Sequence, residues 1–293
     1  VLIDATIEGN GGFSLFNVTS AALSLSNVTM EYGNGTMGGA IAGDLANVTC
    51  KDCSFFNNGA SATGGAISVI RSNVSFAGET VCHRNSAGLE GGCVAAIEGS
   101  LLAFAGETMF KENIANSDGG AVYIDDGSKV IFTGNSSFHE NTAGGSGGAV
   151  LASDSTLAFF GDESSVAFGN NIAALFGGAL SFEGKFALTL EAKSSVFENN
   201  RAPTGGAVYL DGPAFDSVIS AARFTSNSAT LNGGGMVLSR PGGGSKDGEN
   251  QALQLINCTF ENNIAGRGGG AIVVAAGFVQ MNDTIIRNNT AGE

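Results

Sequence analysis

The sequence contains no tryptophan, only three prolines among 293 residues, and 13 basic residues against 27 acidic ones. The resulting net charge of −14 excludes nucleic acid as a partner, because phosphate binding requires a basic surface that releases counterions. Scarce proline excludes collagen, which needs proline as well as glycine. The longest apolar run, Ala271 to Met281, is too short to cross a bilayer, so we expect no membrane insertion by this segment.

The sequence, which starts at Val1, does not open on a charged-then-apolar leader, so we interpret the chain as a mature or trimmed piece of a soluble protein. Glycine is abundant, with 46 residues, about twice its usual share. With 43% hydrophobic and 14% charged residues, the chain is too apolar for an acidic disordered segment. The length allows two ordinary domains, but internal repeats favour one.

Two tetrads recur in step along the whole chain. A Gly-Gly-small-aliphatic tetrad begins at Gly38, Gly64, Gly91, Gly119, Gly147, Gly177, Gly205, Gly234 and Gly269. A Phe-x-x-Asn tetrad accompanies it, with Cys82 and Ile286 replacing phenylalanine in two copies. A fixed period of 20–50 residues indicates a solenoid, propeller or array.

Within one period the pattern is that of strands. Residues 119–124 alternate, and two further short strands are expected at 129–132 and 136–138, separated by turns at 125–128 and 134–135. We therefore predict a right-handed parallel β-helix of about ten coils of ~28 residues. It would comprise an irregular opening at 1–37 and a continuous nine-repeat part at 38–293, forming a single domain with a surface loop insertion at 240–250.

Stacked coils place equivalent side chains in columns. The phenylalanines of the second tetrad would form a core column, and its asparagines would hydrogen-bond to one another along the axis. This predicted asparagine ladder comprises Asn58, Asn85, Asn113, Asn141, Asn171, Asn200, Asn227, Asn263 and Asn289. These motifs are interpreted as residues that specify the fold.

The alternating tetrads resemble the passenger region of chlamydial polymorphic membrane proteins. The resemblance is carried by residues 64–67 (GGAI), 119–122 (GGAV) and 138–141 (FHEN), while the coils at Gly91 and Gly234 depart from it as GGCV and GGMV. It implies a surface-exposed, adhesive β-helix exported as an autotransporter. Similar repeats in large eukaryotic surface proteins point to an extracellular relative as an alternative.

Asn-x-Ser/Thr sequons are more frequent than chance predicts. They are Asn17, Asn27, Asn34, Asn47, Asn73, Asn135, Asn257, Asn282 and Asn288. Such sites accept N-linked glycans in secreted proteins. We therefore expect N-linked glycans and an extracellular or cell-surface location; the alternative is that Asn, Ser and Thr are simply common in β-helix turns.

The five cysteines suggest one or two local bridges. Cys50 and Cys53 flank one turn, while Cys82 and Cys93 lie on either side of an asparagine turn, so either pair is a candidate disulfide. Cys258 is left over, and the alternative is that Cys82, Cys93 and Cys258 are free core thiols. No zinc site is expected, because the two histidines lie two coils apart.

An acidic column, interrupted by Arg71, is predicted six or seven residues after the first glycine of several Gly-Gly pairs. It is formed by Asp44, Glu98, Asp125, Asp126, Asp154, Glu183 and Asp211. Carboxylates about 5 Å apart repel unless a cation or water intervenes. Asp125, Asp126, Asp154 and Asp211 are weak calcium candidates; the alternative is that aspartate simply favours turns. Otherwise no cofactor is expected.

No clustered acid–base set or Ser-His-Asp arrangement can be assigned, so we expect no catalytic residues and no enzyme. The sequence predicts a non-enzymatic, extracellular structural glycoprotein. Because the chain stops where another Gly-Gly pair would begin, either more repeats follow or copies stack head-to-tail into a fibre. The alternatives are an adhesin that binds a cell-surface receptor or glycan, and a polysaccharide lyase or hydrolase.

Overall fold

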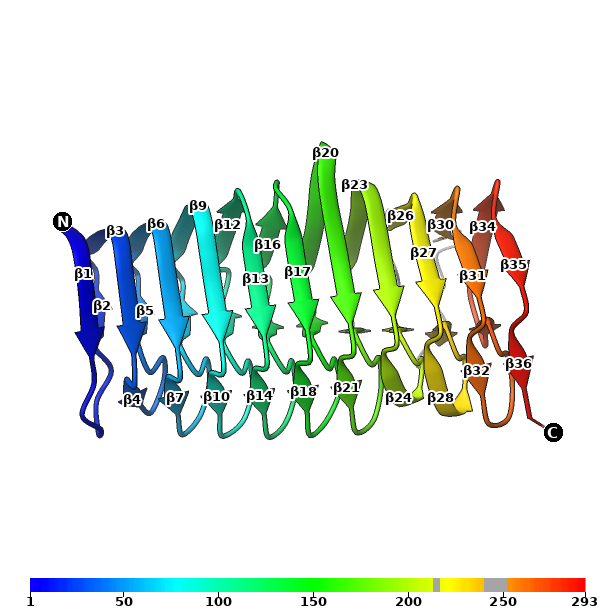
Figure 1. Cartoon of the computed structure of the whole chain (residues 1–293), viewed down its shortest axis with the longest axis horizontal. Coiled ribbons are helices and arrows are strands. Elements are labelled where there is room, and N and C mark those ends of the chain that lie inside the picture. The colour runs from blue at the N-terminus through cyan, green and yellow to red at the C-terminus, as the bar shows by residue number, and fades with distance from the viewer. Residues whose placement is uncertain (213–216, 240–251, 293) are drawn as a thin grey trace.

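A computed structural model describes residues 1–212, 217–239 and 252–292. The expected loop insertion at 240–250 lies outside these residues. All regular structure in the described part is β, and the strands form three parallel sheets that run along the molecule. Successive rungs follow one another in sequence order from the N-terminal end to the C-terminal end (Figure 1).

The main sheet has a path of eleven strands, one per rung. They are β1 (Leu2–Glu8), β3 (Ala22–Glu31), β6 (Asn47–Phe56), β9 (Asn73–His83), β12 (Leu101–Ala105), β16 (Lys129–Phe132), β20 (Thr156–Gly169), β23 (Ala187–Glu198), β26 (Val218–Ser220), β30 (Ala252–Ile256) and β34 (Phe278–Asn282). Where the strand is interrupted, its second half is a separate strand, as in β13 (Thr108–Lys111), β17 (Ser136–His139), β27 (Ala222–Thr225), β31 (Thr259–Glu261) and β35 (Ile285–Arg287).

The second and third sheets have ten short strands each. The second contains β2 (Phe16–Thr19), β5 (Ile41–Asp44), β8 (Ile67–Ile70), β11 (Val94–Ile97), β15 (Val122–Ile124), β19 (Val150–Ser153), β22 (Leu180–Glu183), β25 (Val208–Asp211), β29 (Met236–Ser239) and β33 (Ile272–Val274). The third contains β4 (Asn34–Gly35), β7 (Gly59–Ala60), β10 (Ser86–Ala87), β14 (Ile114–Ala115), β18 (Thr142–Ala143), β21 (Ile172–Ala173), β24 (Arg201–Thr204), β28 (Ser228–Asn232), β32 (Ile264–Ala265) and β36 (Thr290–Ala291).

Equivalent strands of neighbouring rungs pair in parallel and in register. Phe110 of β13, for example, pairs with Phe138 of β17, which pairs with Phe168 of β20. The predicted all-β parallel solenoid with a period of about 28 residues is confirmed, while its right-handed sense stays a prediction. Residues 1–37 are more regular than expected, because β1 to β4 pair with the strands of the following rung.

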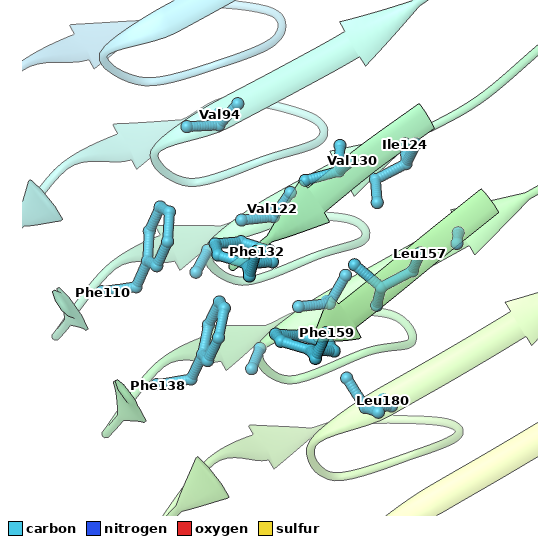
Figure 2. Packing of buried hydrophobic residues seen from close by; sticks show 14 of the residues in the cluster. Val94, Phe110, Val122, Ile124, Val130, Phe132, Phe138, Leu157, Phe159 and Leu180 are labelled. Atoms are coloured by element: carbon cyan, nitrogen blue, oxygen red, sulfur yellow. The ribbon is translucent and has the colours of Figure 1, made fainter. Parts of the chain in front are cut away.

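The core contains two columns of phenylalanine rather than one. In the first column the rings of Phe110 and Phe138 stack with centroids 4.9 Å apart. In the second, Phe132 and Phe159 stack at 4.8 Å, and the columns meet edge to face, as where Phe132 contacts Phe138. Figure 2 shows Phe110 over Phe138 and Phe132 over Phe159, beside aliphatic side chains from the second sheet. Stacking these rings away from water supplies much of the hydrophobic stabilisation.

The Gly-Gly corner requires glycine for two different reasons. Gly147 has a φ of +66°, which is strained for residues with a Cβ. Gly148 has no room for a Cβ, because the Gly178 carbonyl of the next rung lies in its place. One predicted register was wrong by a residue: Gly233, not Gly234, takes the left-handed position, so Gly235 replaces the corner alanine and pairs with Ala207.

Candidate functional site

The asparagines of the second tetrad form a continuous buried ladder on the inside of one corner. From Asn85 onward, the amide oxygen of each asparagine accepts bonds from the backbone N–H and the side-chain amide of the asparagine one rung earlier. The remaining amide hydrogen donates to a backbone carbonyl, as from Asn171 to Phe138 at 2.9 Å. Every hydrogen-bonding group of an interior ladder amide is therefore used, and the corner needs no water.

The residue before each ladder asparagine adopts a left-handed conformation whatever its type. Arg84, Glu112 and Ser226 occupy this position with φ of 57°, 55° and 55°. Such angles are uncommon outside glycine and asparagine. The ladder holds the backbone in this conformation, so the side chains at these positions point outward from the corner and lie at the surface.

A serine ladder at a second corner was not predicted. The hydroxyl of Ser100 accepts the backbone N–H of Ser72 at 3.1 Å, and that of Ser128 accepts the N–H of Ser100 at the same distance. The three serines lie 28 residues apart in the sequence, so the period could have revealed them. Their role is structural, because they pair backbone donors that are buried in the corner.

The sequon asparagines lie on the outside of the solenoid. All nine are exposed, namely Asn17, Asn27, Asn34, Asn47, Asn73, Asn135, Asn257, Asn282 and Asn288. Eight of the nine ladder asparagines are buried. Even adjacent residues are separated in this way, since Asn288 projects from the corner while Asn289 donates its amide to the Phe260 carbonyl. A sugar could be attached to any sequon without entering the core.

The cysteines divide into one disulfide and three free thiols. Cys82 and Cys93 are bonded, with their Cα atoms 6.3 Å apart. The expected bridge between Cys50 and Cys53 is not formed, and both are buried free thiols. They contact each other through a thiol–thiol hydrogen bond, which raises the pKa of Cys50 and lowers that of Cys53. Cys258 is also free and buried.

The predicted single acidic column is wrong, because the seven carboxylates belong to two neighbouring columns. Glu183 and Asp211 are register partners in β22 and β25, whereas Asp44 faces Ile70. The second column is the left-handed position after the strand, which holds Glu98, Asp126 and Asp154 with φ of 53°, 51° and 44°. Turn geometry therefore places three of these seven acids.

Several carboxylates of this edge have partners, whereas the buried Oδ1 of Asp211 has no hydrogen-bond partner among the described residues. Arg71 lies between Asp44 and Glu98, with nitrogen–oxygen distances of 2.7 Å and 3.6 Å. Tyr123 donates its hydroxyl to Asp125 at 2.9 Å. The Asp154 carboxylate accepts the backbone N–H of Lys185 at 2.8 Å. Across the described residues, no three His, Cys, Asp or Glu side chains are grouped as a metal site.

Two half-buried glutamates, Glu183 of the acidic edge and Glu90 before the corner glycine Gly91, have perturbed pKa values. Burial, and next the negative charge of Asp118, raise the pKa of Glu90. Burial, followed by the charges of Asp118, Asp211 and Asp125, raises the pKa of Glu183. Raised carboxyl pKa values occur at catalytic acids and also in structural clusters of like charges.

A compact ionic network beside the main sheet lowers a glutamate pKa instead of raising it. The carboxylate oxygens of Glu112 lie 2.6 Å from Nε of Arg84 and 3.3 Å from Nζ of Lys111. Nε2 of His83 lies 3.6 Å from the same carboxylate. The Arg84 hydrogen bond is the main reason that the pKa of Glu112 falls to about 2. His139 is the register partner of Lys111 on its other side. His83 and His139 therefore lie on either side of Lys111. The spacing in the sequence indicated only that the two histidines are two coils apart.

A sequence model of the Chlamydia polymorphic membrane protein repeat matches two segments, residues 52–70 and 257–275. Each segment contains one copy of both tetrads, since Asn58 and Gly64 lie in the first and Asn263 and Gly269 in the second. The predicted similarity to these repeats is confirmed. Neither curated proteins nor solved structures yield a match to the chain. Among the described residues, no helix has the length and apolarity needed to span a membrane.

Proposed function

We propose that the chain is a non-enzymatic, surface-exposed structural segment that carries N-linked glycans outside the cell. One observation carries the proposal: asparagines with a sequon are exposed, whereas asparagines of the ladder are buried. Selection for folding alone requires the ladder and gives no reason to place a hydroxyl two residues after so many exposed asparagines. The β-solenoid and its repeats fit a passenger-like structural or adhesive role at a surface.

The construction of the solenoid supports a structural role. Its aromatic columns, asparagine ladder and serine ladder all act between neighbouring rungs, so rigidity is distributed along the whole length. Three carboxylates of the acidic edge, Asp44, Asp125 and Asp154, are bonded to Arg71, Tyr123 and a backbone amide. These three are therefore not free to exchange a proton, as the acid–base pair of glycoside chemistry must be.

The test is to secrete the chain from a eukaryotic cell and measure its intact mass before and after enzymatic removal of N-glycans. We expect a mass decrease on glycan removal and conversion of occupied asparagines to aspartates, which peptide mapping locates. Conversion should occur at exposed sequons and at no ladder asparagine. An unchanged mass would contradict the glycoprotein proposal.

An adhesive role is the second candidate, and the match to polymorphic membrane protein repeats favours it. It predicts saturable binding of the purified chain to intact cells, which is competed by unlabelled chain. The unfolded chain is the control for nonspecific adsorption. Binding that does not saturate would contradict the adhesive role and leave the structural role unaffected.

Pairing of the last rung with a further rung is part of the proposal, and that rung comes either from a second copy stacked head-to-tail or from further repeats of a longer chain. Among the described residues, the last-rung strands β34, β35 and β36 pair with the rung before them, and Phe278 and Ile285 are 61% and 54% exposed. Such an edge presents unpaired backbone groups and apolar surface to a further rung. Sedimentation velocity at rising protein concentration should reveal elongated oligomers, and a single concentration-independent species would contradict stacking.

A further inference from the structure

Two exposed sequon asparagines are direct partners in neighbouring rungs. Asn47 begins β6 and Asn73 begins β9, and the two residues pair in register. The side-chain amide of Asn73 donates to the amide oxygen of Asn47 at 3.4 Å. The hydroxyls of the two sequons follow the same pattern, since Ser75 donates to Thr49 at 3.4 Å. Two complete sequons therefore occupy one place on the surface.

A shallow hollow of about 190 Å³ lies between these sequons and the next rung. Asn47 and Asn73 form one side of it, while Leu101 and Ala103 form the other. Leu101 follows Asn73 in the same outward column and is 40% exposed. An apolar side chain beside an attachment point can pack against the face of a sugar ring. The hollow is smaller than the ~300 Å³ of typical ligand pockets, so we take it to accommodate a single ring.

We propose that Asn47 and Asn73 form one glycan-acceptor unit, which carries a single N-linked glycan in the folded chain on either asparagine. This inference rests on the proposed glycoprotein role. Paired strands lie roughly 4.8 Å apart, and both side chains leave the sheet in the same direction. Two branched glycans would therefore compete for the same space, and the sugar that covers Leu101 excludes the other.

The test counts glycans per chain by intact mass, after each glycan has been trimmed to its first sugar. The full chain is compared with Thr49→Ala, Ser75→Ala and the double variant, all secreted from the same eukaryotic cells. Both hydroxyls are exposed, so the substitutions remove a sequon without disturbing the core. Ser137→Ala, which removes the separate sequon at Asn135, is the matched control for loss of an independent site.

We expect each single variant to keep the glycan number of the full chain, because the remaining asparagine takes over, and the double variant to lose one glycan. Loss of one glycan in each single variant and two in the double would overturn the shared unit while leaving the glycoprotein proposal intact. A loss in only one single variant would mean a fixed site and would overturn exchange between the two asparagines. Glycans that are present elsewhere but unchanged in the double variant would show that neither asparagine is used. A chain without any glycan would overturn both proposals.

Discussion

Asn113 accepts two hydrogen bonds from Asn85 through a single amide oxygen, at 3.0 Å from the backbone N–H and 3.1 Å from the side-chain amide. Its own amide then donates to the Cys82 carbonyl and to Asn141, both at 3.0 Å. One side chain thus joins three successive rungs. Because every partner is buried, the same side chain cannot be removed without leaving several polar groups unpaired.

Asn113→Ala should lower the free energy of unfolding by about 3 kcal/mol or more, since each buried unpaired donor or acceptor costs about 1–3 kcal/mol. The measurement is urea unfolding followed by circular dichroism. Asn116→Ala is the matched control, because Asn116 belongs to the same rung but is exposed; its effect should stay within about 0.5 kcal/mol. Equal effects of the two variants would contradict the structural role of the ladder.

The repeat period predicted the ladder because the same residue type occupies the same position in every coil. It could equally have revealed the second aromatic column, since Phe76, Phe104 and Phe132 recur at the same 28-residue interval as their neighbours in the first column. The left-handed position before each ladder asparagine could not be predicted. Arg84 and Ser226 share no chemistry, and their conformation follows from the bonds of the next residue.

The arrangement of charges was also beyond the sequence. Counting from the Gly-Gly pairs placed Asp44 and Glu98 in one acidic column, but a difference of one residue puts them in neighbouring columns on a strand and a turn. Arg71, which interrupts the sequence pattern, contacts both carboxylates. Side-chain direction alternates with each residue of a strand, so a spacing that varies by one residue cannot define a site.

Gly147→Ala should destabilise the chain much more than Gly127→Ala, although both glycines have left-handed φ values of +66° and +72°. A Cβ on Gly127 meets nothing within 4 Å, whereas on Gly147 it would collide with the Val150 carbonyl oxygen. Gly127→Ala should cost about 1 kcal/mol from backbone strain alone. Gly147→Ala should cost at least about 2 kcal/mol more. Thermal unfolding of both variants measures the difference, and equal losses would show that the corner tolerates a side chain.

Restoring the repeat pattern should compensate for loss of the disulfide. Cys82 stands in the first aromatic column between Phe55 and Phe110, and Cys93 takes the corner position that alanine holds in the rungs on either side. Removing the bond in Cys82→Ala/Cys93→Ala should cost about 3 kcal/mol in chain entropy, together with the cavity left in the aromatic column.

The matched variant is Cys82→Phe/Cys93→Ala, which also lacks the bond but fills the column with a stacked ring. It should melt at a higher temperature than the double-alanine variant when both are followed by circular dichroism. A lower melting temperature for the phenylalanine variant would mean that this rung has no room for a phenylalanine ring between Phe55 and Phe110, and that the disulfide is needed because the site is too small for the ring.

Glu112 and Glu183 should show opposite dependence on pH. The ordinary glutamate pKa is 4.5, and Arg84 lowers that of Glu112 to about 2 in the folded chain. Ionised Glu112 therefore stabilises the fold above pH 4.5, and this contribution disappears as the pH falls towards 2. Glu112→Gln should lower the melting temperature at pH 7 and have little effect near pH 2.

The pKa of Glu183 is raised by burial and by neighbouring carboxylates, so its ionised form opposes folding at neutral pH. Glu183→Gln should raise the melting temperature at pH 7, with a gain in the free energy of unfolding of no more than about 1 kcal/mol because the side chain is half-exposed and screened by water. The gain should shrink as the pH falls through the raised pKa of the folded chain towards 4.5, and should be absent at lower pH, where the wild-type carboxyl is protonated in both the folded and the unfolded chain. Melting curves of the two glutamine variants across pH 2–8 give the comparison. If both variants respond to pH in the same direction, the acidic edge is not under electrostatic strain, and Glu183 behaves as an ordinary surface carboxylate.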